Sequence, residues 1–414
     1  MKFDNIIIGG GLGGFISGIE TVRAGMRTAI ISTGQSALHF WGGSFGFLGS
    51  VNGEKVTDNL LEHAAMLPAD HPYRRLGIER TGKMLGRAPE FLAEAGINME
   101  GSLKRNHFRL TPMGFLKPAW LSLEEYATLE HRDQWAGRKA AIVNVRSYID
   151  FYPGFLANGL AQLGVESQCH EVDVPQLDVL RKSTTEMRAT NMSRFLTNDS
   201  VDMLADAINK VSGKANMVIM PAILGIFSDE PVKRLRERVD KPVWFIATTP
   251  ASVPGVRCQL ALRNLFTSLG GVFLPGDTVV EGTVRNHRLE SVRTTNFGDM
   301  PLYADNVVMS TGSFFGHGIV ADMSHIYEPI LGLDVNLTGG RSEWYSPNLY
   351  DPQPYMKAGV VTDDEFHPLL RGEVIDNVYV AGALLGGVNT LKEGSGAGIT
   401  IATALHAAER ITAK

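Results

Sequence analysis

Three glycines near the amino end have the spacing of a phosphate-binding turn. Gly9, Gly11 and Gly14 form the pattern G-x-G-x-x-G, which follows the apolar run 3–8 and precedes a stretch typical of a helix. In such a turn the first glycine makes the bend, the second admits a phosphate, and the third lets the helix pack on the strand. Unpaired N–H groups at the helix start then attract the phosphate. The pattern predicts a nucleotide-type cofactor site.

A second glycine-rich turn lies near the carboxyl end, in residues 377–398 (NVYVAGALLGGVNTLKEGSGAG). An apolar strand ends there in Ala-Gly, and a turn of small residues opens the last helix. N–H groups at such a helix start stabilise the negative charge that a reduced flavin develops. The residues expected to line this side of a flavin are Gly382, Lys392, Gly394, Gly396 and Gly398. A loop that only reverses the chain is the alternative, since glycine suits any tight turn.

Two strand ends lack the acid that usually binds a ribose. Ser32 stands where dinucleotide-binding units carry Asp or Glu for the adenosine ribose. Ala383 stands where flavoproteins commonly carry an acid for a ribose or ribityl hydroxyl. Either the cofactor lacks adenosine, as FMN does, or serine and backbone groups hold FAD less directly. The pattern favours FMN, with FAD as the alternative.

Two further segments are expected to pass close to the flavin. Residues 36–44 (SALHFWGGS) fall where flavoproteins run backbone past the isoalloxazine ring, and a glycine pair there permits close approach. The residues concerned are Ser36, His39, Gly42 and Gly43. Plain packing is the alternative for the aromatic side chains in this segment. Gly312 ends the run 307–312 (VVMSTG), which resembles the strand-to-turn element that closes under such a cofactor.

Two basic residues are candidates for contact with a substrate. His317 (in SFFGHG) and Arg257 (in SVPGVR) lie close to glycines, and we expect both on loops near the cofactor domain. A phosphorylated polyol needs a cation for its phosphate and a base for its hydroxyl proton. With His39, these residues are the candidate catalytic groups. The alternative is a surface histidine and a salt-bridged arginine.

These motifs require a Rossmann-type α/β fold. Residues 3–34 have the pattern of a βαβ unit, and parallel strands of that kind need a sheet that is covered on both faces. In the middle of the chain, helix-like and strand-like stretches of a different pattern follow one another, and the sheet-building pattern returns from residue 258. The sequence predicts a discontinuous flavin-binding domain, residues 1–54 plus 256–414, with an inserted second α/β domain, residues 55–255, for substrate or interaction.

Composition excludes several classes of protein. Lys and Arg number 39 against 44 Asp and Glu, for a net charge of −5, and nothing suggests the concentrated basic face of a nucleic-acid binder. Cys169 and Cys258 are the only cysteines, too few for an iron–sulfur cluster or a disulfide framework. A reducing cytoplasm fits this usage, and no metal site is expected.

The amino end runs directly into a strand, so no signal peptide is expected. No uncharged apolar stretch approaches the length of a membrane-spanning helix, which is about 18 residues or more. We therefore expect contact with a membrane only through other proteins.

Taken together, these segments resemble the B subunits of anaerobic glycerol-3-phosphate dehydrogenases. The resemblance rests on FDNIIIGGGLGG (3–14), RTAIISTGQSALHF (27–40), QLDVLRKSTTEMRATN (176–191), PASVPGVR (250–257), GSFFGHG (312–318), EPILGLDV (328–335) and VYVAGALLGG (378–387). It spans essentially the whole chain, and its middle motifs belong to no generic flavoprotein pattern.

The resemblance implies a protein that carries FMN and pairs with a larger, flavin-containing A subunit. A third protein, the iron–sulfur C subunit, would tie the pair to the membrane quinone pool. The implied reaction is oxidation of sn-glycerol 3-phosphate to dihydroxyacetone phosphate, with electrons passed to quinone and onward to fumarate or nitrate.

Two other hypotheses stay open. One is a free-standing FAD oxidoreductase of another small substrate, which tight FAD retention and activity without partners would favour. The other is a non-catalytic assembly subunit whose flavin site has decayed, because the absent acids at Ser32 and Ala383 fit that reading equally.

Overall fold

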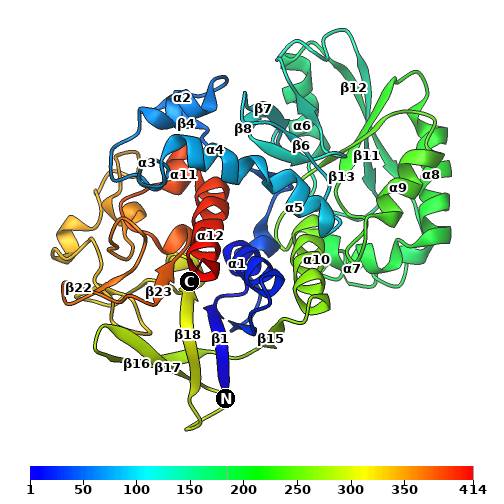
Figure 1. The fold of residues 1–414 in the computed structure, drawn as a ribbon. Helices are drawn as coiled ribbons and strands as arrows, with labels where there is room; N and C mark the ends of the chain where they lie inside the picture. Colours follow the sequence, from blue (N-terminus) through cyan, green and yellow to red (C-terminus); the bar gives the residue numbers. More distant parts are fainter. Residues whose placement is uncertain (184, 414) are drawn as a thin grey trace. The chain divides into compact units, whose positions relative to one another are not determined.

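The computed structural model describes residues 1–183 and 185–413. The chain divides into two compact units (Figure 1). Unit 1 is Met1–Ala37, Gly46–Gly96 and Ala261–Lys414, and unit 2 is Leu38–Phe45 and Ile97–Leu260. Each unit contains its own sheet of parallel strands, so both are α/β in class.

Unit 1 is built on a seven-stranded sheet. Strands β15, β2, β1, β18 and β23 run parallel in that order, and β16 and β17 form an antiparallel hairpin beside β18. The strands are β1 (Lys2–Ile8), β2 (Thr28–Ser32), β15 (Val272–Pro275), β16 (Val279–Arg285), β17 (Arg288–Thr294), β18 (Leu302–Met309) and β23 (Val378–Val380).

The core of unit 1 lies along the two central strands. Ile6, Ile7 and Ile30 have no exposed surface, as expected for parallel strands that are covered on both faces. Helices α1 (Leu12–Arg23) and α12 (Gly396–Thr412) pack side by side, with α1 also against β1 and α12 against β23 (Figure 1). The Rossmann-type fold expected from the first thirty or so residues is confirmed.

Shorter elements complete unit 1. Its other helices are α2 (Leu60–Ala65), α3 (Pro72–Leu76), α4 (Ile78–Gly86), α5 (Ala88–Glu94) and α11 (Thr390–Glu393). Its short strands are β4 (Ser50–Val51), β5 (Glu54–Lys55), β19 (Val320–Ala321), β20 (Ile326–Tyr327), β21 (Leu369–Leu370) and β22 (Glu373–Val374). None of the described helices in either unit is long and apolar enough to span a membrane.

Unit 2 contains a four-stranded parallel sheet of order β12-β11-β13-β14. Its strands are β11 (Lys139–Val145), β12 (Glu166–Val172), β13 (Met217–Pro221) and β14 (Val243–Ile246). Its helices are α6 (Pro153–Gln162), α7 (Ala189–Phe195), α8 (Asn198–Ser212), α9 (Glu230–Arg238) and the first part of α10 (Val253–Ser268).

Two small antiparallel sheets complete unit 2, with orders β10-β7-β8 and β3-β9-β6. Their strands are β3 (Ser44–Phe45), β6 (Met99–Gly101), β7 (His107–Leu110), β8 (Leu116–Ala119), β9 (Leu121–Leu123) and β10 (Thr128–Leu129). These sheets hold the polar side chains discussed below.

The unit boundaries differ from those expected at residues 54 and 255. Residues 46–96 fall in unit 1, because α3 and α4 pack on α12 through apolar faces. Residues 38–45 fall in unit 2, where β3 pairs with β9. Both differences arise from contacts between segments far apart in the chain, which local sequence texture does not reveal.

Candidate functional site

The first and third glycines of the amino-terminal turn are required by the backbone itself. Gly9 has φ +117°, and a Cβ there would overlap the carbonyl of Ser310 at the end of β18. A Cβ on Gly14 would overlap the carbonyl oxygen of Gly9. Any side chain at either position would force the turn or the helix to shift.

Gly11 is different, because a side chain there would make only an ordinary van der Waals contact. The nearest atom to a Cβ at Gly11 would be the Cβ of Ser36, at 3.7 Å. Gly11 is the N-cap of α1, and within the described residues that helix start has neither a side-chain cap nor an acidic first-turn residue. The first N–H groups of a helix have no partner inside the helix. The turn therefore offers helix N–H groups without a partner inside the helix, which are the donors that suit the phosphate of a flavin nucleotide.

Ser32 lies at the end of β2, 5% exposed, and its hydroxyl donates to the carbonyl of Gly34 at 3.0 Å. The hydroxyl also leaves no room for a side chain at Gly10, because a Cβ there would lie 2.5 Å from Ser32 Oγ. Ser32 is thus beside the glycine turn as expected, with its hydroxyl already bonded within the chain.

An acid that the sequence reasoning missed lies next to Ser32. Asp277 follows the adjacent strand β15, and its N–H donates to the Ser32 carbonyl at 3.3 Å. Its Oδ1 accepts from Thr295 Oγ1 and the Asn296 N–H, both at 3.0 Å. Asp277 is 1% exposed, and its Oδ2 has no hydrogen-bond partner among the described residues. An acid two residues beyond a strand that pairs with β2 was the available signal.

The carboxyl-terminal turn meets the expectation only in part. Helix α12 does begin at Gly396, and its N-cap Ser395 makes no side-chain cap bond in the described chain. The N–H of Gly398, however, donates to the Gly46 carbonyl at 2.9 Å, and a Cβ there would overlap the Tyr73 hydroxyl. Gly398 therefore serves close packing rather than binding, and only the donors nearer the start of α12 are available to a cofactor.

The other residues that were expected near the flavin lie in backbone turns or on the surface. Gly394 caps α11 with φ +66°, and Gly382 has φ +74° with its N–H bonded to Thr403 Oγ1 at 3.0 Å. Lys392 is exposed on α11. Gly312, with φ +80°, makes the turn after β18 as expected.

A hydrogen-bond network that the sequence motifs did not indicate fixes the start of α12. Tyr73 is fully buried, and its hydroxyl donates to the carbonyls of Phe47, at 2.8 Å, and Ser395, at 3.3 Å. Glu393 accepts from the Ser395 hydroxyl at 3.0 Å and lies 3.2 Å from His71 Nε2. These side chains position the turn from residues 71–73, which the sequence reasoning assigned to the other domain.

The glycine pair Gly42 and Gly43 is not open, contrary to the expectation. A Cβ on Gly42 would lie 2.6 Å from Arg109 Nη1, and that nitrogen donates to the Gly42 carbonyl. Gly43 has φ +80°, and its Cβ would overlap the ring of Tyr126. Both glycines make room for side chains of unit 2 itself, so the pair gives no sign of a cofactor surface.

His39 is the only one of the three candidate catalytic residues with an unpaired buried atom. It is 9% exposed in the 3₁₀ turn Ala37–Phe40, and its Nδ1 has no hydrogen-bond partner in the described residues. Burial lowers the pKa of His39, and a hydrogen bond with Gln259 partly opposes that shift. A neutral, buried imidazole can serve as a hydrogen-bonding group at neutral pH.

Arg257 is not on a loop, contrary to expectation. It lies in α10, is 8% exposed, and donates to Glu125 Oε1 at 2.6 Å and to the Gly225 carbonyl at 3.2 Å. Arg257 therefore makes the salt bridge that the alternative expects. His317 is exposed at the end of the 3₁₀ turn Phe314–Gly316 and belongs to unit 1, whereas Arg257 and His39 belong to unit 2.

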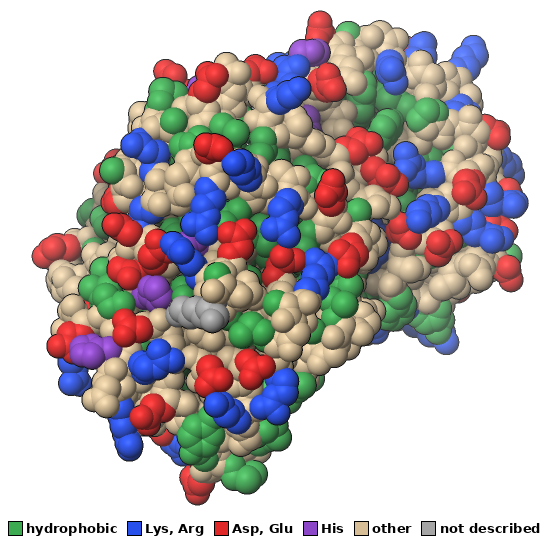
Figure 2. Space-filling model, viewed as in Figure 1, with side chains coloured by type: hydrophobic (Ala, Val, Ile, Leu, Met, Phe, Trp, Pro, Cys, Tyr) green, Lys and Arg blue, Asp and Glu red, His purple; other side chains and the backbone are tan. Residues whose placement is uncertain are grey.

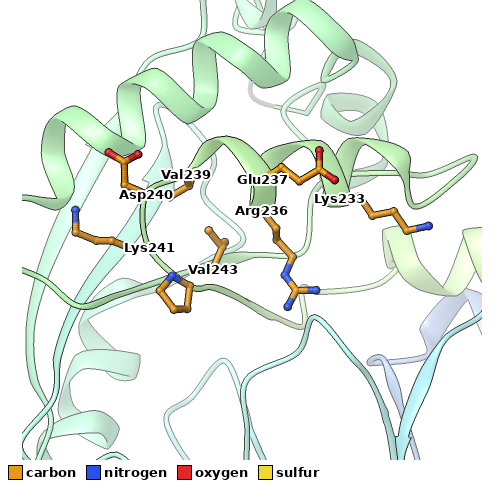
Figure 3. A pocket seen from close by; sticks show the side chains of 8 residues that line it. Lys233, Arg236, Glu237, Val239, Asp240, Lys241 and Val243 are labelled. Carbon is orange, nitrogen blue, oxygen red and sulfur yellow. The ribbon is translucent and has the colours of Figure 1, made fainter.

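Neither the face drawn in Figure 2 nor the hollow of unit 2 adds a candidate. On the face drawn in Figure 2, acidic and basic side chains are interspersed. A hollow of about 470 Å³ lies in unit 2 between α9 and β14 (Figure 3). Its lining residues are Lys233, Arg236, Glu237, Val239, Asp240, Lys241, Pro242 and Val243. None of them is a sequence-predicted site residue, and two of its cations are paired outside it, Lys233 with Asp229 and Arg236 with Glu124. Within the described part of the chain, no group of His, Cys, Asp or Glu is arranged to hold a metal.

Comparison with known proteins identifies the family. Residues 4–399 match the FAD binding domain family. The chain is 40% identical over 418 residues to the B subunit of anaerobic glycerol-3-phosphate dehydrogenase from Yersinia enterocolitica, covering 99% of this chain and 98% of the relative. It is 35% identical to the protein of that name from Pectobacterium atrosepticum, covering 99% of each chain.

Among solved structures, the chain is similar to a 3-ketosteroid delta1-dehydrogenase from Sterolibacterium denitrificans, with 12% identity, a TM-score of 0.46 and coverage of 100% and 99% of the two chains. A similarity at that level says nothing about function. The sequence matches are stronger, and they agree with the Rossmann-type glycine turn of unit 1. The chain is an oxidoreductase subunit that belongs to the FAD binding domain family and to the family of B subunits of anaerobic glycerol-3-phosphate dehydrogenase.

Proposed function

We propose that this chain is the flavoprotein subunit of a quinone-linked complex that oxidises sn-glycerol 3-phosphate to dihydroxyacetone phosphate. The observation that carries the proposal is identity of 33–40% to proteins named as B subunits of anaerobic glycerol-3-phosphate dehydrogenase, over nearly the full length of both chains. The substrate loses two electrons and two protons, and the quinone takes up both to become quinol.

Unit 1 would hold the flavin. Its phosphate would lie at the start of α1 beside Gly11, where the first N–H groups have no partner inside the helix. The start of α12, positioned by Tyr73 and Glu393, would supply further donors. A flavin held by these residues would supply the capacity to accept a hydride from the substrate.

FMN remains the flavin that the neutral residues Ser32 and Ala383 suggest. One observation favours FAD instead: the buried carboxylate of Asp277 restores an acid beside Ser32, with Oδ2 unpaired among the described residues. An acid in this region suits the hydroxyls of an adenosine ribose. The FAD binding domain family match is also consistent with FAD.

The partners proposed are a larger, flavin-containing A subunit, together with an iron–sulfur C subunit. The name of the relatives indicates a complex of several subunits. This chain has two cysteines, Cys169 and Cys258, which are too few to ligate a cluster. Cys258 is buried, which raises its pKa to about 12 and makes it a poor thiolate ligand. Any membrane contact would then pass through the partners.

The test is to purify the full chain alone and with the A and C subunits. Flavin released by denaturation is identified by chromatography and mass, and glycerol 3-phosphate-dependent reduction of a soluble quinone analogue is followed in the complex. About one flavin per chain, and quinone reduction that requires this protein, is the expected result. A chain that stays colourless after reconstitution with its partners would contradict the proposal and leave an assembly role.

If the chain alone retains FAD and turns over another small substrate without these partners, the free-standing oxidoreductase is correct instead. A released mass of FMN or of FAD decides between the two cofactors.

A further inference from the structure

Two positively charged side chains lie opposite each other on the small sheet β10-β7-β8 of unit 2. Arg109 in β7 and Lys117 in β8 are direct cross-strand partners in an antiparallel pair. Side chains at such positions are about 5 Å apart at Cβ, and like charges there destabilise the sheet. No ion pair involves either residue in the described chain. The pair is thus a local concentration of uncompensated charge.

Arg109 is held in place without being neutralised. Its Nη1 donates to the Gly42 carbonyl, and the missing side chain of Gly42 leaves room for the guanidinium. Its Nε is buried with no hydrogen-bond partner among the described residues. Burial lowers the pKa of Arg109, and burial together with the Arg109 charge lowers the pKa of Lys117. The protein thus bears an electrostatic cost at this position that an anion would relieve.

A second unpaired donor lies beside Arg109. Tyr126 is 1% exposed, its ring packs on Gly43, and its hydroxyl has no hydrogen-bond partner in the described residues. Burial and the charge of Glu125 raise the pKa of the Tyr126 phenol, and the charges of Arg109 and Arg257 oppose that shift. Glu125 precedes Tyr126 in the chain and is paired with Arg257. A buried hydroxyl without a partner is costly unless a ligand or water completes it.

The other titratable groups near the pair do not cancel its charge. His107 lies two residues from Arg109 on the same face of β7, with Nε2 at 2.7 Å from Ser122 Oγ. Burial and then Arg109 lower its pKa to about 4, so it is neutral at pH 7. Glu130 is exposed, and its charge partly opposes the lowering of the His107 pKa. Glu125 is paired with Arg257.

We propose that Arg109, Lys117 and the Tyr126 hydroxyl form a binding subsite for a phosphate group. A guanidinium and an ammonium with an added hydroxyl donor are the groups that bind phosphate oxygens most strongly. That the phosphate belongs to a phosphorylated polyol rests on the proposed function. The subsite itself rests only on the residues of unit 2.

The experiment measures binding of radiolabelled inorganic phosphate to the full chain by equilibrium dialysis. Glycerol 3-phosphate is expected to compete and glycerol is not. Lys117→Ala changes an exposed residue that the fold does not need, and Arg109→Lys keeps the charge but loses the planar fork. Each should weaken phosphate binding about tenfold to a hundredfold, the usual range for one charged hydrogen bond.

Arg236→Gln is the matched control, because it removes a cation from the hollow of Figure 3 in the same unit. Binding that is unchanged in both Lys117→Ala and Arg109→Lys overturns the subsite. Binding that is lost in Arg236→Gln instead also overturns it and moves the anion to the hollow.

The two proposals fail separately. Phosphate binding that depends on Lys117 in a chain without flavin would leave the subsite standing and the proposed dehydrogenase function contradicted. A flavin-loaded complex that oxidises glycerol 3-phosphate with the same KM in Lys117→Ala would leave the function standing and the subsite wrong.

Discussion

The glycine turn of unit 1 and the glycine pair of unit 2 look alike in sequence and differ in use. Beside Gly11 a Cβ would meet only Ser36 Cβ, at 3.7 Å, and the first N–H groups of α1 have no partner inside the helix. Beside Gly42 and Gly43 the space is filled by Arg109 and Tyr126. Glycine permits close approach in both places, but the protein's own side chains fill the space at Gly42 and Gly43, whereas a side chain at Gly11 would meet only Ser36. A glycine in sequence therefore predicts proximity without naming the partner.

The largest effect we expect comes from the buried ion pair behind the second region. Arg257→Ala should cost about 3–5 kcal/mol of unfolding free energy, because it leaves Glu125 buried and uncompensated. Urea denaturation of the purified chain measures this. Adding Glu125→Gln should recover part of the loss. If stability is unchanged while turnover in the complex falls, Arg257 is a catalytic residue after all.

Acid should affect each unit through one buried histidine. The pKa values of His107 in unit 2 and His406 in unit 1 are both lowered to about 4, chiefly by burial. The unfolded chain therefore binds more protons than the fold between about pH 6.5 and pH 4. Stability is full above this window and falls as the pH drops through it.

Replacing His107 with Gln should flatten the pH dependence of the unfolding of unit 2, and His406→Gln should flatten that of flavin release from unit 1. Denaturation curves and flavin release from pH 7 to pH 4 provide the check. Identical curves for both variants and the unchanged chain would show that neither histidine is responsible.

Two substitutions in the turn Gly9–Gly14 compare a glycine that packing requires with one that has room for a side chain. Gly14→Ala should cost about 1–3 kcal/mol, since the added methyl overlaps the Gly9 carbonyl. Gly11→Ala should leave stability nearly unchanged, because the methyl would make only an ordinary contact with Ser36 Cβ, at 3.7 Å. It should nevertheless weaken flavin retention by obstructing the phosphate. Thermal unfolding and flavin content are measured together. Equal retention in Gly11→Ala and the unchanged chain would contradict the assignment of the phosphate to α1.

The smallest effect on stability is expected for Tyr126→Phe. The hydroxyl has no partner among the described residues, so its removal should change the unfolding free energy by less than about 1 kcal/mol. Phosphate affinity should nevertheless fall. A large loss of stability would mean that the hydroxyl already has a protein or water partner and is unavailable to a ligand.

Much of unit 1 could be predicted from the sequence because its signals are local. The turn Gly9–Gly14 lies within six residues between a strand and a helix, and β2 follows as an apolar run. Short-range periodicity and turn chemistry suffice for such elements.

The candidate site was less predictable because its contacts join distant segments. Asp277 reaches Ser32 only because β15 pairs with β2, and Glu125 meets Arg257 across 132 positions of the chain. The expectation that Arg257 lay on a loop failed because the helix α10 begins at Val253, within a segment rich in turn residues.

The order of residues alone was enough for the α/β class, the strand–turn–helix at Gly9–Gly14 and the family, because each depends on short spans or on the whole chain compared at once. The folded chain was needed to decide which glycines stay open and which charges are paired. Those outcomes depend on packing between remote segments, where a few ångströms separate a filled space from a binding site.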